Sequence, residues 1–219
     1  MTIMKMLKNS LHLRLLILIS AILAIVLDGI GSVGFFVFKP LTTILILLLP
    51  ILYQDPEAKI YVKSIVFGLV FCLFGDAFLL FNSYFLFGLG SFLIGHLFFL
   101  YAFVKRQGWQ KRYGIGLFLV ILAIGICWLI QDKLNTLLIP VLLYMLVIVL
   151  MSWQGWGLAL NSKTKNLRSL GLGVSLFMFS DTLIAFDKFY IPFSYSGLLI
   201  LATYWIAIYI IALSGTRIK

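Results

Sequence analysis

Two aspartates, Asp76 and Asp181, each lie inside a run of apolar residues long enough to cross a lipid bilayer. They end similar tetrapeptides, Leu-Phe-Gly-Asp and Met-Phe-Ser-Asp. A carboxylate in hydrocarbon costs about 3 kcal/mol or more, so a chain that carries two is expected to use them. Burial favours the protonated form of a carboxyl group, and two such groups can divide the roles of acid and base. The pair is therefore the candidate catalytic centre.

The composition is that of a polytopic membrane protein. Hydrophobic residues make up 63% of the chain, charged residues make up 11%, and the mean hydropathy is +1.14. Soluble domains have about 45 to 50% apolar residues. The net charge of +10 comes from lysines and arginines in the short connections between apolar runs, where they set topology and contact anionic lipid heads. We therefore predict no nucleic-acid partner.

The few cysteines and histidines argue against a metal site built by the protein. Cys72 and Cys127 both lie in apolar runs without a CxxC spacing, and the chain has only two histidines. Buried cysteines most often act as small hydrophobic side chains. We predict no metal and no organic cofactor.

Eight apolar segments are long enough to cross a bilayer, which takes about 20 residues each. They predict an all-α fold with eight transmembrane helices in a single domain over residues 1–219. The first has a basic approach but is too long for a signal peptide, and we interpret it as a retained helix. The predicted helices are 14–34, 39–53, 61–81, 84–104, 113–131, 136–154, 168–186 and 193–213.

Orientation follows from the positive-inside rule. With a cytoplasmic N-terminus, 14 lysines and arginines fall on the cytoplasmic side, and only Lys39, Lys133 and Lys188 fall opposite. Both termini are therefore predicted to be cytoplasmic, and an even number of spans is required.

The two aspartates also suggest an internal repeat. A shift of four helices preserves direction, so the repeat would be parallel, with a pseudo-twofold axis along the membrane normal. Such symmetry would bring the carboxylates toward a shared cavity. A shift of 105 residues superposes Gly68 on Gly173, Phe74 on Phe179, Asp76 on Asp181 and Phe81 on Phe186.

Helical rise places several polar residues at similar depths. At about 1.5 Å per residue, three aspartates lie roughly 6 to 8 Å to the non-cytoplasmic side of their helix midpoints. Lys39 begins the second predicted helix at the same rim. The predicted polar layer comprises Asp28, Lys39, Asp76 and Asp181, with His96 and Tyr204 beneath it.

Structural interpretations stand beside these functional ones. Asp28 and Lys39 could mark helix ends and pair with each other or with lipid head groups. The two central aspartates could be neutral carboxyl groups that are merely hydrogen-bonded.

The remaining polar residues also have structural alternatives. His96 and Tyr204 could form interhelical hydrogen bonds without a catalytic part. Gly75 and Ser180 could serve only close helix packing.

The ordered motifs resemble the YhhN family of lysoplasmalogenases from about residue 39 to residue 215. Two departures stand out: Phe99 lacks the hydroxyl expected three residues after the histidine, and no glutamine occurs near Ile208. The motifs that carry the resemblance are Lys39-Pro40-Leu41, Gly75-Asp76, Gly95-His96 followed by Tyr101, Pro140-Val141 with Tyr144-Met145, Ser180-Asp181 and Thr203-Tyr204.

The resemblance implies a membrane hydrolase that cleaves the vinyl-ether bond at the sn-1 position of a lysoplasmalogen. The products would be a fatty aldehyde and a glycerophospho-ethanolamine or -choline. The partners are then a lysophospholipid with one long alkenyl chain and the surrounding membrane, the cell inner membrane if the source is bacterial. The expected catalytic residues are Asp76 and Asp181, and the expected substrate-binding residues are Lys39, His96, Tyr204, Asp28 and Ser180.

This chemistry suits two carboxyl groups. An enol ether is cleaved by protonation of its β-carbon, which creates an oxocarbenium ion that water attacks to give a collapsing hemiacetal. One acid supplies the proton, and a second carboxylate stabilises the cation and activates water. Lys39 could pair with the lipid phosphate.

Two rival functions use the same residues. A transporter could bind protons or cations at the two aspartates during alternating access. A metal-dependent intramembrane lipid hydrolase is a weaker rival because histidines are scarce.

Overall fold

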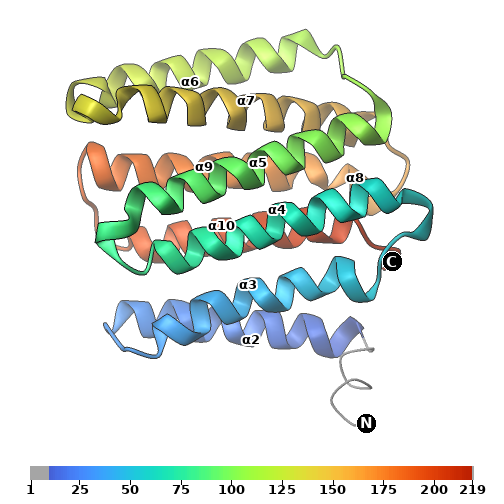
Figure 1. The fold of residues 1–219 in the computed structure, drawn as a ribbon, viewed down its shortest axis with the longest axis horizontal. Coiled ribbons are helices and arrows are strands. Elements are labelled where there is room, and N and C mark those ends of the chain that lie inside the picture. Colours follow the sequence, from blue (N-terminus) through green and yellow to red (C-terminus); the bar gives the residue numbers. More distant parts are fainter. Residues whose placement is uncertain (1–9, 219) are drawn as a thin grey trace.

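A computed structural model describes residues 10–218, and within this range the chain forms eight long α-helices and no β-strand (Figure 1). A four-residue helix, α8, and three short 3-10 turns lie in the connections. The long helices are α2 (Ser10–Gly29), α3 (Phe35–Leu52), α4 (Lys59–Phe78), α5 (Phe85–Gln107), α6 (Tyr113–Leu134), α7 (Leu138–Asn161), α9 (Leu170–Phe189) and α10 (Ser196–Ser214). The short elements are η1 (Pro56–Ala58), η2 (Asn82–Tyr84), η3 (Asn135–Leu137) and α8 (Lys165–Arg168).

Among the described residues, seven continuous helical segments are long and apolar enough to cross a membrane. The longest, Tyr113–Asn161, contains both α6 and α7. A straight helix of its 49 residues would be about 74 Å long, more than twice the bilayer core. Instead the chain turns at η3, and α6 packs against α7. The predicted all-α membrane fold is confirmed, and this turn accounts for its eight helices.

The long helices run side by side along the long axis of the molecule (Figure 1). The α6–α7 pair lies at one edge, and the α2–α3 pair lies at the other. Because successive helices are antiparallel, the chain enters α2 and leaves α10 at the same end. The connections after α2, α4, α6 and α9 lie at the opposite end.

Most helix limits differ from the predicted ones by about one turn or less, and the largest difference is at the end of α7, which reaches Asn161 instead of residue 154. The first helix ends at Gly29, because Gly31 adopts a left-handed backbone with φ of 64°. The second therefore begins at Phe35, four residues before the predicted start at Lys39. Lys39 consequently lies in the second turn of α3 and not at its end.

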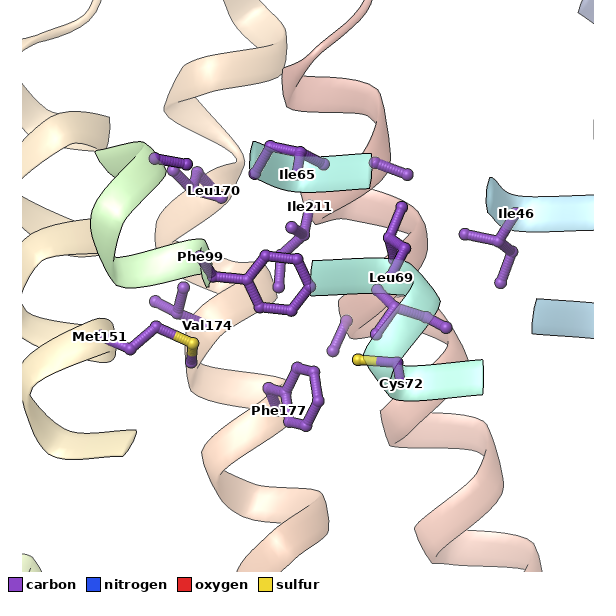
Figure 2. Packing of buried hydrophobic residues seen from close by; sticks show 14 of the residues in the cluster. Ile46, Ile65, Leu69, Cys72, Phe99, Met151, Leu170, Val174, Phe177 and Ile211 are labelled. Atoms are coloured by element: carbon purple, nitrogen blue, oxygen red, sulfur yellow. The ribbon is translucent and has the colours of Figure 1, made fainter. Parts of the chain in front are cut away.

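Glycines bring α4 and α5 close together. A Cβ atom at Gly68 would lie 2.3 Å from the Phe99 ring, and one at Gly75 would lie 2.5 Å from the Phe92 ring. Figure 2 shows the Phe99 and Phe177 rings in the centre of the core. Small residues allow this approach, as is common between membrane helices. The glycine before Asp76 therefore has a packing role.

The pairs of helices in contact agree with the parallel repeat. The pairs α2–α3, α3–α4 and α4–α5 correspond to α6–α7, α7–α9 and α9–α10, and all six are in contact. The contact between α3 and α10 corresponds to the contact between α5 and α7. The repeat remains an interpretation of this packing.

Candidate active site

Asp181 lies in an apolar pocket between α5, α6, α7 and α9. Its Oδ2 atom accepts a hydrogen bond of 2.6 Å from the Tyr144 hydroxyl. The cavity has a volume of about 70 Å³, room for a few water molecules. Its lining is Leu79, Phe85, Leu89, Phe92, Ala123, Ile126, Ile130, Val141, Tyr144, Met145, Ile148, Met178, Asp181, Thr182, Ile184, Ala185 and Phe189.

His96 lies directly behind this carboxyl group. Its Nε2 atom is 3.7 Å from Asp181 Oδ2, and its side chain is fully buried. The ring packs edge-on against Phe177 and Tyr144, at centroid distances of 4.5 and 5.2 Å. Neither ring nitrogen has a hydrogen-bond partner among residues 10–218. Buried polar atoms are usually satisfied, so two nitrogens without a partner mark this ring as a candidate site residue.

Asp76 belongs to a second polar group, formed by α3, α4 and α10. Its Oδ2 atom accepts hydrogen bonds from the Thr43 hydroxyl at 2.5 Å and the Tyr204 hydroxyl at 2.9 Å. Trp205 Nε1 donates to the Thr43 hydroxyl oxygen at 3.3 Å. Asp76 is 1% exposed and does not line the pocket around Asp181.

Lys39 is buried, with 7% of its surface exposed, and is not at an open rim. Its ammonium lies 5.6 Å from the centroid of the Phe35 ring and is within electrostatic range of both Asp76 and Asp28. It forms none of the ion pairs found among residues 10–218. The early start of α3 explains this burial, because it moves Lys39 about 6 Å deeper than the predicted helix end.

Asp28 contacts the beginning of α10. Its Oδ2 atom approaches Gly197 so closely that a Cβ atom there would lie 2.2 Å away. The N-terminal end of a helix favours a negative charge, so this position suits a carboxylate. The contact favours the structural interpretation of Asp28.

Aromatic rings separate the two aspartate groups. Phe92 packs against Phe177 and Tyr204, with ring centroids 6.5 and 5.7 Å apart. Phe177 in turn packs against His96 and Tyr204. Both carboxyl groups are within electrostatic range of the Cys72 thiol. The predicted polar layer is thus divided into two groups that share one core, and the pocket contains only Asp181.

Ser180 connects two helices instead of facing the pocket. Its hydroxyl donates to the Ile200 carbonyl oxygen at 3.0 Å, which joins α9 to α10 next to Asp181. This hydrogen bond fixes the position of α9 at the carboxyl group. Ser180 is therefore placed to orient Asp181.

The site also contains partners that were not among the predicted site residues. The sequence pattern includes Tyr144 as part of a family motif, but this motif does not indicate a role in the site. Thr43 is a threonine in an apolar run, and nothing in the sequence distinguishes it. The repeat shift of 105 residues superposes Lys39 on Tyr144, so each aspartate has a polar neighbour from the equivalent helix. That correspondence was the available signal for Tyr144.

Within residues 10–218 no group of three or more His, Cys, Asp or Glu side chains comes together. The residues of the candidate site that could do chemistry are two separated carboxyl groups, each hydrogen-bonded to a tyrosine.

The membrane-length helices and buried carboxyl groups define a multi-pass membrane protein with a polar centre inside its apolar bundle. The YhhN family model matches residues 34–215, and the chain belongs to this family. The match confirms the family expected from the sequence.

Two relatives of known name match part of the chain. Lysoplasmalogenase TMEM86A of Bos taurus is 37% identical over 129 residues, which cover 57% of this chain and 52% of the relative. Lysoplasmalogenase TMEM86B of Homo sapiens is 33% identical over 124 residues, covering 56% and 50%. The chain thus spans about half the length of the relatives it matches. No solved structure matches it significantly.

The two departures from the family pattern lie in the apolar core. Phe99 is fully buried against Gly68, and Ile208 is also fully buried. Neither position lines the pocket around Asp181.

Proposed function

We propose that this protein hydrolyses the vinyl-ether bond of a lysoplasmalogen, releasing a fatty aldehyde and a glycerophospho-ethanolamine or -choline. The observation that carries the proposal is a single carboxyl group, Asp181, in a pocket within the membrane spans whose other lining side chains are apolar apart from Tyr144 and Thr182. The names of the two relatives support the same reaction.

Asp181 is the proton donor in this proposal. Its proton moves to the β-carbon of the vinyl ether, and the double-bond electrons form the new C–H bond, leaving an oxocarbenium ion. The carbon is a poor base, so holding the acid against it contributes through orientation. The Tyr144 hydroxyl fixes the rotamer of the carboxyl group by its 2.6 Å hydrogen bond.

Water completes the reaction. It adds to the carbon that bears the ether oxygen, and its proton passes to the Asp181 carboxylate, which lines the pocket. The hemiacetal then breaks its C–O bond, giving the aldehyde and the free glycerol hydroxyl. His96 lies 3.7 Å from Asp181, behind the carboxyl group, and so is placed to orient it.

Asp76 contributes as the second carboxylate. It shares the aromatic core with the pocket without lining it, so its negative charge acts on the cation at longer range. Electrostatic interactions are strong in such a low-dielectric interior. Tyr204 and Thr43 orient this charge by their hydrogen bonds.

The purified protein in detergent should release aldehyde from a lysoplasmalogen, and chelator should not change the rate. A lysophospholipid with a saturated sn-1 ether is the matched control, because it lacks the double bond that accepts the proton and should give no product. Absence of aldehyde from the lysoplasmalogen, in a folded preparation, would contradict the proposed function. The comparisons lend no support to the transporter alternative.

We further propose that both termini are cytoplasmic and that the pocket lies in the outer half of the membrane. Nearly all of the described loop lysines and arginines lie at the end where α10 finishes, and Lys133 and Lys188 lie at the other. In a variant without Cys72 and Cys127, an impermeant thiol reagent applied from outside should modify Asn82→Cys and Lys188→Cys. Lys165→Cys should be spared. The opposite labelling pattern would invert the protein and place the pocket in the cytoplasmic leaflet.

A further inference from the structure

The middle of α6 contributes no buried side chain to the bundle. No residue in the stretch 120–129 is buried, although buried residues precede and follow it. At the opposite edge of the bundle, α2 has a buried residue at nearly every turn. The edge helices α2 and α6 have similar hydrophobicity, but only α6 lacks buried residues in its middle. This stretch of α6 lies beside the Asp181 pocket.

A groove lies on the outer side of α6, opposite the Asp181 pocket. It runs along α6 and α7 on the surface of the bundle. Ala123 and Met145 line both the groove and the inner pocket, so the seam between the two helices is one side chain thick at that point. The groove is lined by Val120, Ala123, Ile124, Cys127, Trp128, Gln131, Leu142, Met145, Leu146 and Val149.

The pocket is too small for a long alkyl chain. Its volume of about 70 Å³ holds only a few water-sized groups. In the proposed reaction the vinyl ether is at Asp181, at the glycerol end of the chain, so most of the chain must lie elsewhere. The direct route outward passes between Ala123, which is small, and Met145, which is unbranched and adaptable.

We propose, resting on the proposed function, that the seam at Ala123 and Met145 is a lateral passage for the alkyl chain of the lipid substrate, whose tail occupies the outer groove beside Cys127. The groove has no charged side chain in its lining. It belongs to the most hydrophobic of the membrane-length segments in the described chain, whose outer surface meets lipid. A hydrocarbon chain from the bilayer is therefore the occupant that fits.

The polar end of the groove agrees with this direction. Gln131 is the lining residue nearest to the end of α6, and Asp132 and Lys133 follow it. The groove thus has its polar side chain at the membrane rim and apolar ones inward. A tail that leaves the pocket through the seam lies against these apolar side chains, while the head group stays with the glycerol on the pocket side of the seam.

Cys127 provides a native probe of the passage. It is partly exposed in the groove, whereas Cys72 is fully buried. Treatment with decyl methanethiosulfonate should attach a decyl chain to Cys127, with the extent measured by mass spectrometry. We expect kcat/KM for the lysoplasmalogen to fall at least about tenfold because the attached chain competes for the groove, and methyl methanethiosulfonate should have a smaller effect.

A matched control places the same chain elsewhere on the helix. Leu117 is 63% exposed on α6 and does not line the groove. In Cys127→Ser with Leu117→Cys, full decyl modification should change kcat/KM less than about twofold relative to the same protein before treatment. Unchanged kcat/KM in the wild-type protein after complete modification of Cys127 would overturn the passage while leaving the proposed function intact.

The rate of modification gives a second readout that needs no turnover. A lysophospholipid with one saturated chain should slow the modification of Cys127, and glycerophosphocholine should not. If the untreated protein releases no aldehyde, the proposed function fails, and this protection still decides the passage. Equal rates with and without the lipid would overturn it. Protection that instead rises with protein concentration, without lipid, would assign the groove to a second copy of the chain and also overturn it.

Discussion

Asp181→Asn is expected to lower kcat for vinyl-ether hydrolysis at least about 100-fold, because a positioned acid contributes about 10² to 10⁴ to the rate. The amide matches the carboxyl group in size and still accepts the hydrogen bond from Tyr144, so the fold should be retained. It cannot give a proton to carbon. Aldehyde release by the purified variant, with its thermal unfolding compared with wild type, measures both effects.

Asp187→Asn is the matched control on the same helix. Asp187 is near the end of α9, where its Oδ1 atom accepts a bond from the Phe193 backbone N–H, and it does not line the pocket. The same chemical change there should leave kcat within about twofold. Near-normal turnover by well-folded Asp181→Asn would remove this carboxyl group from the mechanism and leave Tyr144 and His96 without a role in catalysis.

The two aspartates could be identified from the sequence because the free-energy cost of a carboxyl group in an apolar span depends mainly on the residues next to it in the sequence. A carboxyl group inside an apolar span is unfavourable whatever surrounds it, so its presence alone indicates use. The eight helices were predictable for a similar reason, since each span must satisfy its own backbone in lipid. The fold class followed from these features, and the family was indicated by the ordered motifs from Lys39-Pro40-Leu41 to Thr203-Tyr204.

The arrangement of the polar residues could not be obtained in the same way. Helical rise gives the depth of Asp76 and Asp181, but the direction in which each points depends on rotation about the helix axis. A helix that is apolar all round has no stripe that fixes this rotation. Depth therefore predicted one layer, and the structure separates it into two groups by the rings of Phe92 and Phe177.

The burial of Lys39 shows how a small boundary error changes a functional interpretation. Starting the second helix at Lys39 placed its ammonium at the rim, where lipid phosphate could meet it. The helix begins at Phe35, so Lys39 lies among buried residues within electrostatic range of Asp76. Helix boundaries depend on local turns such as the left-handed Gly31, which an apolar sequence pattern does not reveal.

Asp76→Asn is expected to lower kcat at least about 100-fold, by removing the second carboxylate that stabilises the oxocarbenium ion. The hydrogen bonds from Thr43 and Tyr204 can still be accepted by the amide oxygen. Asp76 differs from Asp181, however, in having a buried ammonium nearby. The Asp76→Asn substitution should therefore also lower the thermal stability of the protein, because it leaves the Lys39 ammonium without its compensating charge.

A double variant separates these two effects. In Asp76→Asn with Lys39→Met, the buried ammonium is removed together with its partner, so the unfolding temperature should return toward that of wild type. Aldehyde release should stay at the level of Asp76→Asn, since the negative charge near the cation is still missing. The single Lys39→Met variant, measured alongside, completes the cycle and shows how strongly the two charges are coupled. Recovery of both stability and turnover in the double variant would mean that Asp76 only compensates Lys39, and Asp181 would then be the one carboxyl group in the mechanism.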